Sequence, residues 1–91
     1  MYEAKTVVRN IPGIHARPAA LLVKEASLFK ADVTLATPDL TVNAKSIMGV
    51  MMLAAETGTE LTVRAEGSDE QAAVAALIRL VESGFGEELG A

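Results

Sequence analysis

The sequence predicts an α+β domain with the element order βαββαβα and all helices packed on one face of the sheet. Two patterns support this. Residues 60–66 alternate polar and apolar side chains, with Leu61, Val63 and Ala65 on one face, as in a strand that buries only one side. Other segments instead repeat apolar residues at helical spacing. Because the second face of the sheet is polar, all three helices are expected to cover the apolar face.

The first half of the chain is expected to contain three strands and one long helix. Residues 5–9 read as a short first strand. The helix predicted over 16–29 carries apolar residues three or four positions apart, namely Ala19, Leu22, Val23, Ala26 and Phe29. Residues 33–35 then alternate in character as a second strand does. Pro38-Asp39 supplies a turn into a third strand over 40–43.

The second half is expected to add a short helix, the strand over 60–66 and a final helix. Ser46 is placed to begin the short helix, and Gly58 to end it. Ser68 and Gln71 have the spacing of a capping box for the last helix, which should end near Gly84. The inner stripe of that helix consists of Ala73, Val74, Leu77, Leu80 and Val81.

Composition restricts the classes of function. The 91 residues, 51% hydrophobic and 22% charged, predict a single folded domain over 1–91. A net charge of −4 argues against nucleic acid as a partner. The chain has no cysteine, no secretion signal and no apolar run of about 20 residues, so we expect a cytoplasmic protein without membrane insertion. No cofactor or metal is expected, because metal-ligand spacing and a glycine-rich nucleotide loop are both missing.

The only histidine, His15, stands where the first amphipathic helix begins. A helix start has unpaired N–H groups and a partial positive charge, so the amides of Ala16 and Arg17 are expected to form an anion site. Arg17 adds a planar, permanently charged phosphate partner, and Pro18 fits the first turn of a helix. These groups together suit reversible transfer of a phosphoryl group to histidine. The alternative is that His15 only caps its helix and Arg17 is a solvated surface charge.

A second segment combines a candidate cap with an unusually apolar helix. Ser46 can serve simply as an N-cap. Residues 47–55 are apolar on every side, although a short surface helix needs only one apolar stripe. Val50 is expected to point inward, and Met52 and Leu53 are also assigned to the core. The residues that would then share an outward patch, of the adaptable kind that meets several partners, are Ile47, Met48 and Met51.

The two segments with these features are Gly13-Ile14-His15-Ala16-Arg17-Pro18-Ala19-Ala20 and Val42-Asn43-Ala44-Lys45-Ser46-Ile47-Met48-Gly49-Val50-Met51. Taken together, they resemble HPr, the histidine phosphocarrier family of the bacterial sugar phosphotransferase system. The resemblance runs from near Lys5 to Phe85-Gly86-Glu87. It departs from the family pattern at Thr37-Pro38-Asp39-Leu40 and at Ile11-Pro12. The resemblance implies an open-faced β-sandwich, in which three helices cover one face of a four-stranded antiparallel sheet.

The resemblance also implies roles for individual residues. His15 would be phosphorylated at Nδ1, with Arg17 stabilising the phosphate. Enzyme I would pass on a phosphoryl group from phosphoenolpyruvate, and sugar-specific enzyme IIA domains would accept it. The protein would thus be a covalent carrier and not an enzyme with its own turnover. The outward patch, Ile47, Met48 and Met51, would dock partners beside His15.

Ser46 matches the serine that a dedicated kinase modifies in many HPr proteins. This adds HPr kinase/phosphorylase and a transcriptional regulator to the partners that the resemblance implies. The alternative function is a regulatory HPr-like paralogue, acting through phosphorylated Ser46 or on targets other than transport. Paralogues specialised for the serine branch typically lack the histidine, which is present here as His15. A shared docking face suggests a monomer that meets its partners one at a time.

Overall fold

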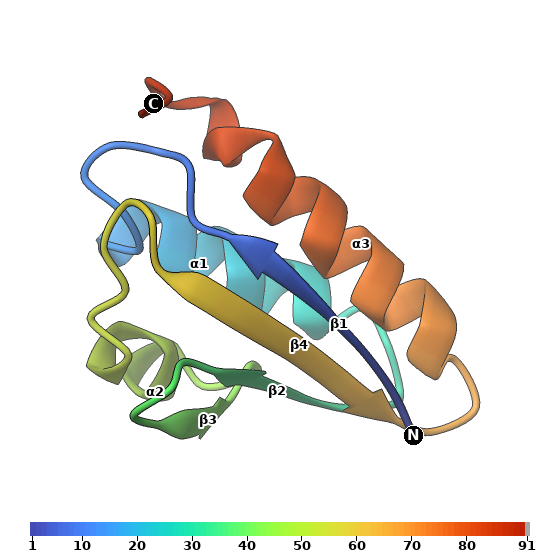
Figure 1. Ribbon diagram of the computed structural model, residues 1–91. Coiled ribbons are helices and arrows are strands. Elements are labelled where there is room, and N and C mark those ends of the chain that lie inside the picture. Colours follow the sequence, from blue (N-terminus) through green and yellow to red (C-terminus); the bar gives the residue numbers. More distant parts are fainter. Residues whose placement is uncertain (91) are drawn as a thin grey trace.

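The computed structural model describes residues 1–90 and confirms the α+β open-faced sandwich (Figure 1). One antiparallel sheet has the strand order β1-β4-β2-β3. Its strands are β1 (Tyr2–Val7), β2 (Asp32–Ala36), β3 (Thr41–Asn43) and β4 (Glu60–Glu66). The helices are α1 (Ala16–Ala26), α2 (Ile47–Met52) and α3 (Glu70–Glu82), and a 3-10 turn, η1 (Gly84–Gly86), follows α3. No helix within residues 1–90 is long and apolar enough to cross a membrane.

Strand β4 lies at the centre of the sheet and confirms the predicted alternation. Leu61, Val63 and Ala65 are buried, while the residues between them face outward. The register places Leu35 of β2 opposite Val63. The core is mainly aliphatic, with Phe85 as a buried aromatic residue, and its largest fully buried side chains include Leu22, Leu35, Leu61 and Leu77.

Several element boundaries differ from those that the local pattern predicts. Strand β1 starts at Tyr2, which pairs with Ala65 across the sheet, and stops at Val7. Helix α1 ends at Ala26 and not at 29, and the next residues form a turn. Strand β3 covers only Thr41–Asn43. Pairing with neighbouring strands sets the ends of β1 and β3, and such pairing leaves no local signal in the sequence.

The predicted capping box at the start of α3 is wrong. The N-cap is Asp69 and not Ser68, and no side chain caps the helix there. The carboxylate of Asp69 instead accepts hydrogen bonds from the backbone amides of Lys30, at 2.8 Å, and Ala31, at 2.9 Å. These bonds, chiefly the one from Lys30, lower the pKa of Asp69. Asp69 therefore fastens the loop before β2 to the start of α3.

Helix α2 begins as predicted but is shorter than expected. Ser46 is its N-cap, and the hydroxyl oxygen accepts a hydrogen bond from the amide of Gly49 at 3.1 Å. Leu53 is buried, as expected, whereas Met52 is 68% exposed, so its assignment to the core is wrong. Only one side of so short a helix can face the core, and Val50 occupies that side. The helix also ends before Gly58, which lies in the turn leading to β4.

Candidate functional site

His15 is the N-cap residue of α1, with extended backbone angles of φ −95° and ψ −164°. Its side chain makes no capping hydrogen bond, which removes the alternative that the imidazole serves as a helix cap. Within residues 1–90, the amides of Ala16 and Arg17 donate to no acceptor. The first turn of α1 contains no acidic residue. The start of α1 thus has the free donors and the partial positive charge that favour an anion.

A buried asparagine organises the loop that leads to His15. Asn10 is completely buried, and its Nδ2 donates to the carbonyl oxygen of Gly13 at 2.8 Å. Gly13 has φ +113°, and a Cβ there would lie 2.5 Å from the carbonyl oxygen of Ala55. The neighbouring amide of Ile14 donates to that same oxygen at 2.8 Å. Glycine is therefore required where this loop crosses the segment that follows α2.

The C-terminal segment runs across the same loop. Figure 1 shows the blue chain before α1 and the red end of the chain at one end of the molecule. The amide of Ile11 donates to the carbonyl oxygen of Glu88 at 2.8 Å, and the amide of Gly90 donates to the carbonyl oxygen of Arg9 at 2.6 Å. These backbone contacts place the side chain of Glu87 against the start of α1.

The carboxylate of Glu87 joins the two residues predicted to carry the chemistry. Its Oε1 and Oε2 lie 3.1 and 3.0 Å from Nε2 of His15. Oε2 also accepts from Nη1 of Arg17 at 3.2 Å, and that Nη1 donates to the carbonyl oxygen of Phe85 at 2.7 Å. Oε1 accepts from Nδ2 of Asn10 at 2.9 Å. The Asn10 bond is the largest influence that lowers the pKa of Glu87, the bonds from His15 and Arg17 add to it, and burial opposes them.

The residues of this network differ in their access to solvent. The side chains of His15 and Arg17 are 42% and 56% exposed, whereas that of Glu87 is only 16% exposed. The imidazole can therefore meet a partner protein while the carboxylate stays beneath it. Arg17 is held on the C-terminal segment through Nη1 alone, so the other N–H groups of its guanidinium remain available as donors.

The sequence reasoning identified His15 and Arg17 but missed Asn10 and Glu87. Glu87 lies 72 residues from His15 and 77 from Asn10 along the chain. No local spacing rule relates residues so far apart. The one available signal was Asn10 shortly before the turn that contains Gly13. That signal does not indicate which residue Asn10 would contact. The resemblance to HPr extended to Glu87 but assigned it no role.

Helix α2 presents the outward patch named above. Ile47, Met48 and Met51 are 44%, 74% and 46% exposed, and Met52 adds a further exposed methionine. Helix α2 packs against α1, and the segment that follows it touches the Gly13 loop, as described above. The apolar surface and His15 are therefore carried by neighbouring parts of the fold.

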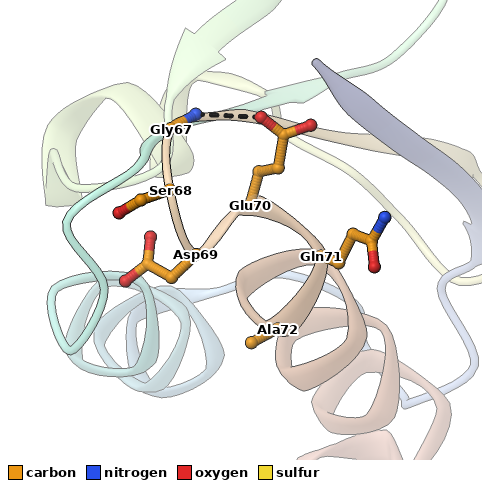
Figure 2. A pocket seen from close by; sticks show the side chains of 6 residues that line it. All are labelled: Gly67, Ser68, Asp69, Glu70, Gln71 and Ala72. Atoms are coloured by element: carbon orange, nitrogen blue, oxygen red, sulfur yellow. Dashed lines mark hydrogen bonds between the residues drawn. The ribbon is translucent and has the colours of Figure 1, made fainter.

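A surface hollow at the start of α3 is unrelated to this site. It is lined by residues 67–72 (Figure 2), where the carboxylate of Glu70 accepts from the amide of Gly67 at 3.1 Å. The 13 residues of α3 separate it from the C-terminal segment, a length of about 20 Å at 1.5 Å per residue. Asp69 and Glu70 make the hollow acidic, and residues 67–72 include no arginine, lysine or histidine, so the hollow does not suit a phosphate. Residues 1–90 hold no group of three or more histidine or carboxylate side chains placed to bind a metal ion.

Comparison with known proteins identifies a family to which the chain is similar. Residues 2–83 match the family model described as the PTS HPr component phosphorylation site. The phosphocarrier protein HPr of Xylella fastidiosa strain 9a5c is 49% identical over 88 residues, which is 97% of this chain and 99% of that protein. The HPr-like protein Crh of Bacillus subtilis is 51% identical over 82 residues, covering 90% and 96% of the two chains.

Solved structures give the same result. The crystal structure of HPr-C-His from Thermoanaerobacter tengcongensis superposes with a TM-score of 0.92 at 47% identity, covering 98% of this chain and all of that one. This TM-score over almost the whole chain shows that the two proteins share one fold. A family model over almost the whole chain, close relatives and a matching fold lead to one conclusion. The chain belongs to the HPr family of phosphocarrier proteins of the phosphotransferase system.

Proposed function

We propose that this protein accepts a phosphoryl group from phosphorylated enzyme I on His15 and passes it to enzyme IIA domains for sugar uptake. The observation that carries this proposal is the position of His15 at the N-cap of α1, beside the unpaired amides of Ala16 and Arg17. The protein is then a covalent carrier whose product is its own phosphohistidine. This role belongs in the cytoplasm, where enzyme I and the enzyme IIA domains act.

The residues around His15 would hold a phosphoryl group without trapping it. Free amides and the helix end favour the dianion, an effect of about 0.3–1 kcal/mol for an exposed group. The guanidinium of Arg17 can form charge-assisted hydrogen bonds to phosphoryl oxygens through the N–H groups that do not bind Phe85 and Glu87. Half-exposed groups give modest stabilisation, which suits a carrier that must release its cargo.

The test is transfer through the complete chain of partners. Labelled phosphoenolpyruvate, enzyme I and an enzyme IIA domain should yield labelled enzyme IIA only when this protein is added. His15→Ala should abolish the transfer while the circular dichroism spectrum stays unchanged. Arg17→Ala should slow transfer without unfolding the domain. Transfer that persists in His15→Ala would refute the proposal, and an unchanged rate in Arg17→Ala would make that arginine a surface charge only.

We further propose that the outward patch, Ile47, Met48 and Met51, docks enzyme I and the enzyme IIA domains. Its support is the exposure of these side chains on α2 together with the packing of α2 against α1. An exposed apolar patch of this kind is typical of a surface that meets partners. A single docking face fits a monomer that binds one partner at a time, which sedimentation at working concentration would test.

A second candidate function is regulation through Ser46, and the similarity to Crh of Bacillus subtilis favours considering it. A phosphate on Ser46 would lie at the N-cap of α2, where negative charge is tolerated, and next to the outward patch. HPr kinase/phosphorylase would add it, and a transcriptional regulator would read it. Incubation with HPr kinase and ATP should place one phosphate on Ser46, and equal labelling of Ser46→Ala would exclude this assignment.

A further inference from the structure

The two ring nitrogens of His15 have different surroundings. Nε2 lies 3.0 and 3.1 Å from the two carboxylate oxygens of Glu87. Nδ1 has no hydrogen-bond partner within the described chain. An ionised carboxylate only accepts hydrogen bonds, so Nε2 must carry the proton to satisfy this contact. In the neutral ring that leaves the lone pair on Nδ1, which faces away from the carboxylate and is free to react.

We propose that Glu87, held in place by Asn10, is a positioning residue that fixes the reactive tautomer and the orientation of the His15 ring. This inference rests on the proposed function, because it assigns a role within phosphoryl transfer to His15. The lowered pKa of Glu87 keeps the carboxylate ionised at neutral pH and so keeps it an acceptor. The arrangement is comparable to other carboxylate–histidine pairs, in which the carboxylate sets the tautomer without itself reacting.

Asn10 gives this carboxylate a rigid anchor. Its Nδ2 donates to both the carbonyl oxygen of Gly13 and Oε1 of Glu87. The reversed amide would place Oδ1 against two acceptors, so only one orientation is compatible with the loop. Within residues 1–90, the buried Oδ1 has no hydrogen-bond partner. A buried polar atom without a partner is unfavourable, so the two Nδ2 bonds are what this residue contributes at the site.

The proposed role is compatible with the balance of the transfer step. The Nδ1 lone pair attacks phosphorus, the bond between phosphorus and its donor on enzyme I breaks, and that electron pair stays with the donor. The ring keeps its proton on Nε2, so it changes from neutral to cationic as the Nδ1–phosphorus bond forms. A carboxylate 3.0 Å from Nε2 stabilises this developing charge. On return of the group to an acceptor, the ring becomes neutral again with the same tautomer.

The experiment uses the fact that the chain contains a single histidine. Nitrogen-15 labelling of histidine gives one pair of ring signals, and their chemical shifts at alkaline pH report the tautomer of the neutral ring. The wild-type protein should show a protonated Nε2 and an unprotonated Nδ1. In Glu87→Gln the amide oxygen can stay with Asn10, which turns the NH2 group toward Nε2. The share of the Nε2-protonated tautomer should therefore fall.

The rate of phosphoryl acceptance from enzyme I should fall in parallel, by about ten-fold. This is the lower end of the range, about 10–100-fold, for losing a partner that orients a metal-binding histidine. We take the lower end because His15 is half-exposed and water can replace part of the contact. Glu87→Asp retains the carboxylate and should recover part of both readouts. Asn10→Ala should shift the tautomer in the same direction as Glu87→Gln, with a smaller effect.

Glu88→Gln is the matched control. It removes the same charge from the adjacent residue, whose exposed side chain forms no hydrogen bond or ion pair within residues 1–90. It should leave both the tautomer and the rate unchanged. A wild-type tautomer in Glu87→Gln would overturn the inference, even if the rate fell. If the wild-type protein accepted no phosphoryl group, the proposed function would fail, while the ring signals would still test the role of Glu87.

Discussion

Replacing Ser46 by alanine tests the local structure on which the α2 surface depends. Ser46 is the only N-cap of the three α-helices whose side chain accepts a capping hydrogen bond, 3.1 Å from the amide of Gly49. Loss of such a cap typically costs about 1 kcal/mol, within a range of about 0.5–2 kcal/mol. For a domain of this size, that corresponds to a fall in Tm of about 4–8 °C. Thermal unfolding followed by circular dichroism measures the change directly.

Two further variants make this result interpretable. Ser68→Ala removes a serine that is exposed and outside any helix, so its Tm should stay close to that of the wild type. Ser46→Asp retains a good N-cap and should recover most of the stability lost in Ser46→Ala. Equal Tm values for Ser46→Ala and Ser68→Ala would show that the cap contributes nothing. A Tm for Ser46→Asp as low as that for Ser46→Ala would have the same meaning.

The remaining predictions concern the core, the docking patch and acid pH. Leu77→Ala, at a fully buried position, should lower the unfolding free energy by about 2–5 kcal/mol in urea titration; a smaller loss would mean that the core collapses around the change. Met48→Asp should weaken binding of enzyme I in calorimetry with little effect on Tm, and the reverse pattern would place Met48 in the core. The folded-state pKa of Glu87 is lowered, so its stabilising contribution is complete above its unfolded pKa of about 4.3 and is lost as pH falls through the folded value. The unfolding free energy of the wild type should therefore decline more steeply than that of Glu87→Gln below about pH 4.3. Urea titrations at about pH 3–5 measure both, and an equal decline in the two proteins would contradict this.

The sequence predicted most of the fold because its strongest patterns are local. The alternation along β4 and the inner stripe of α3 depend on side chains a few residues apart, and both are confirmed, although Leu80 is only partly buried. The start of α3 was mispredicted for the opposite reason. A cap at Ser68 is plausible locally, but Asp69 forms its bonds with backbone amides 38 and 39 residues away.

The site shows the same difference between residues that local patterns identify and residues that only long-range contacts bring in. His15 and Arg17 lie within one short motif whose chemistry can be read from neighbouring residues. Glu87 becomes part of the site only because the C-terminal segment folds back across the loop before α1, which depends on the whole topology. Met52 illustrates a related limit. Apolar character alone did not reveal which side of a six-residue helix faces the core.

The central claim is that His15 carries the phosphoryl group, and mass spectrometry tests it most directly. The protein is incubated with phosphoenolpyruvate and enzyme I, digested under neutral conditions, and its phosphate located before and after brief acid treatment. We predict a single phosphate on His15 that acid removes. A folded protein that acquires no phosphate from an active cognate enzyme I, or an acid-stable phosphate on another residue, would contradict the claim.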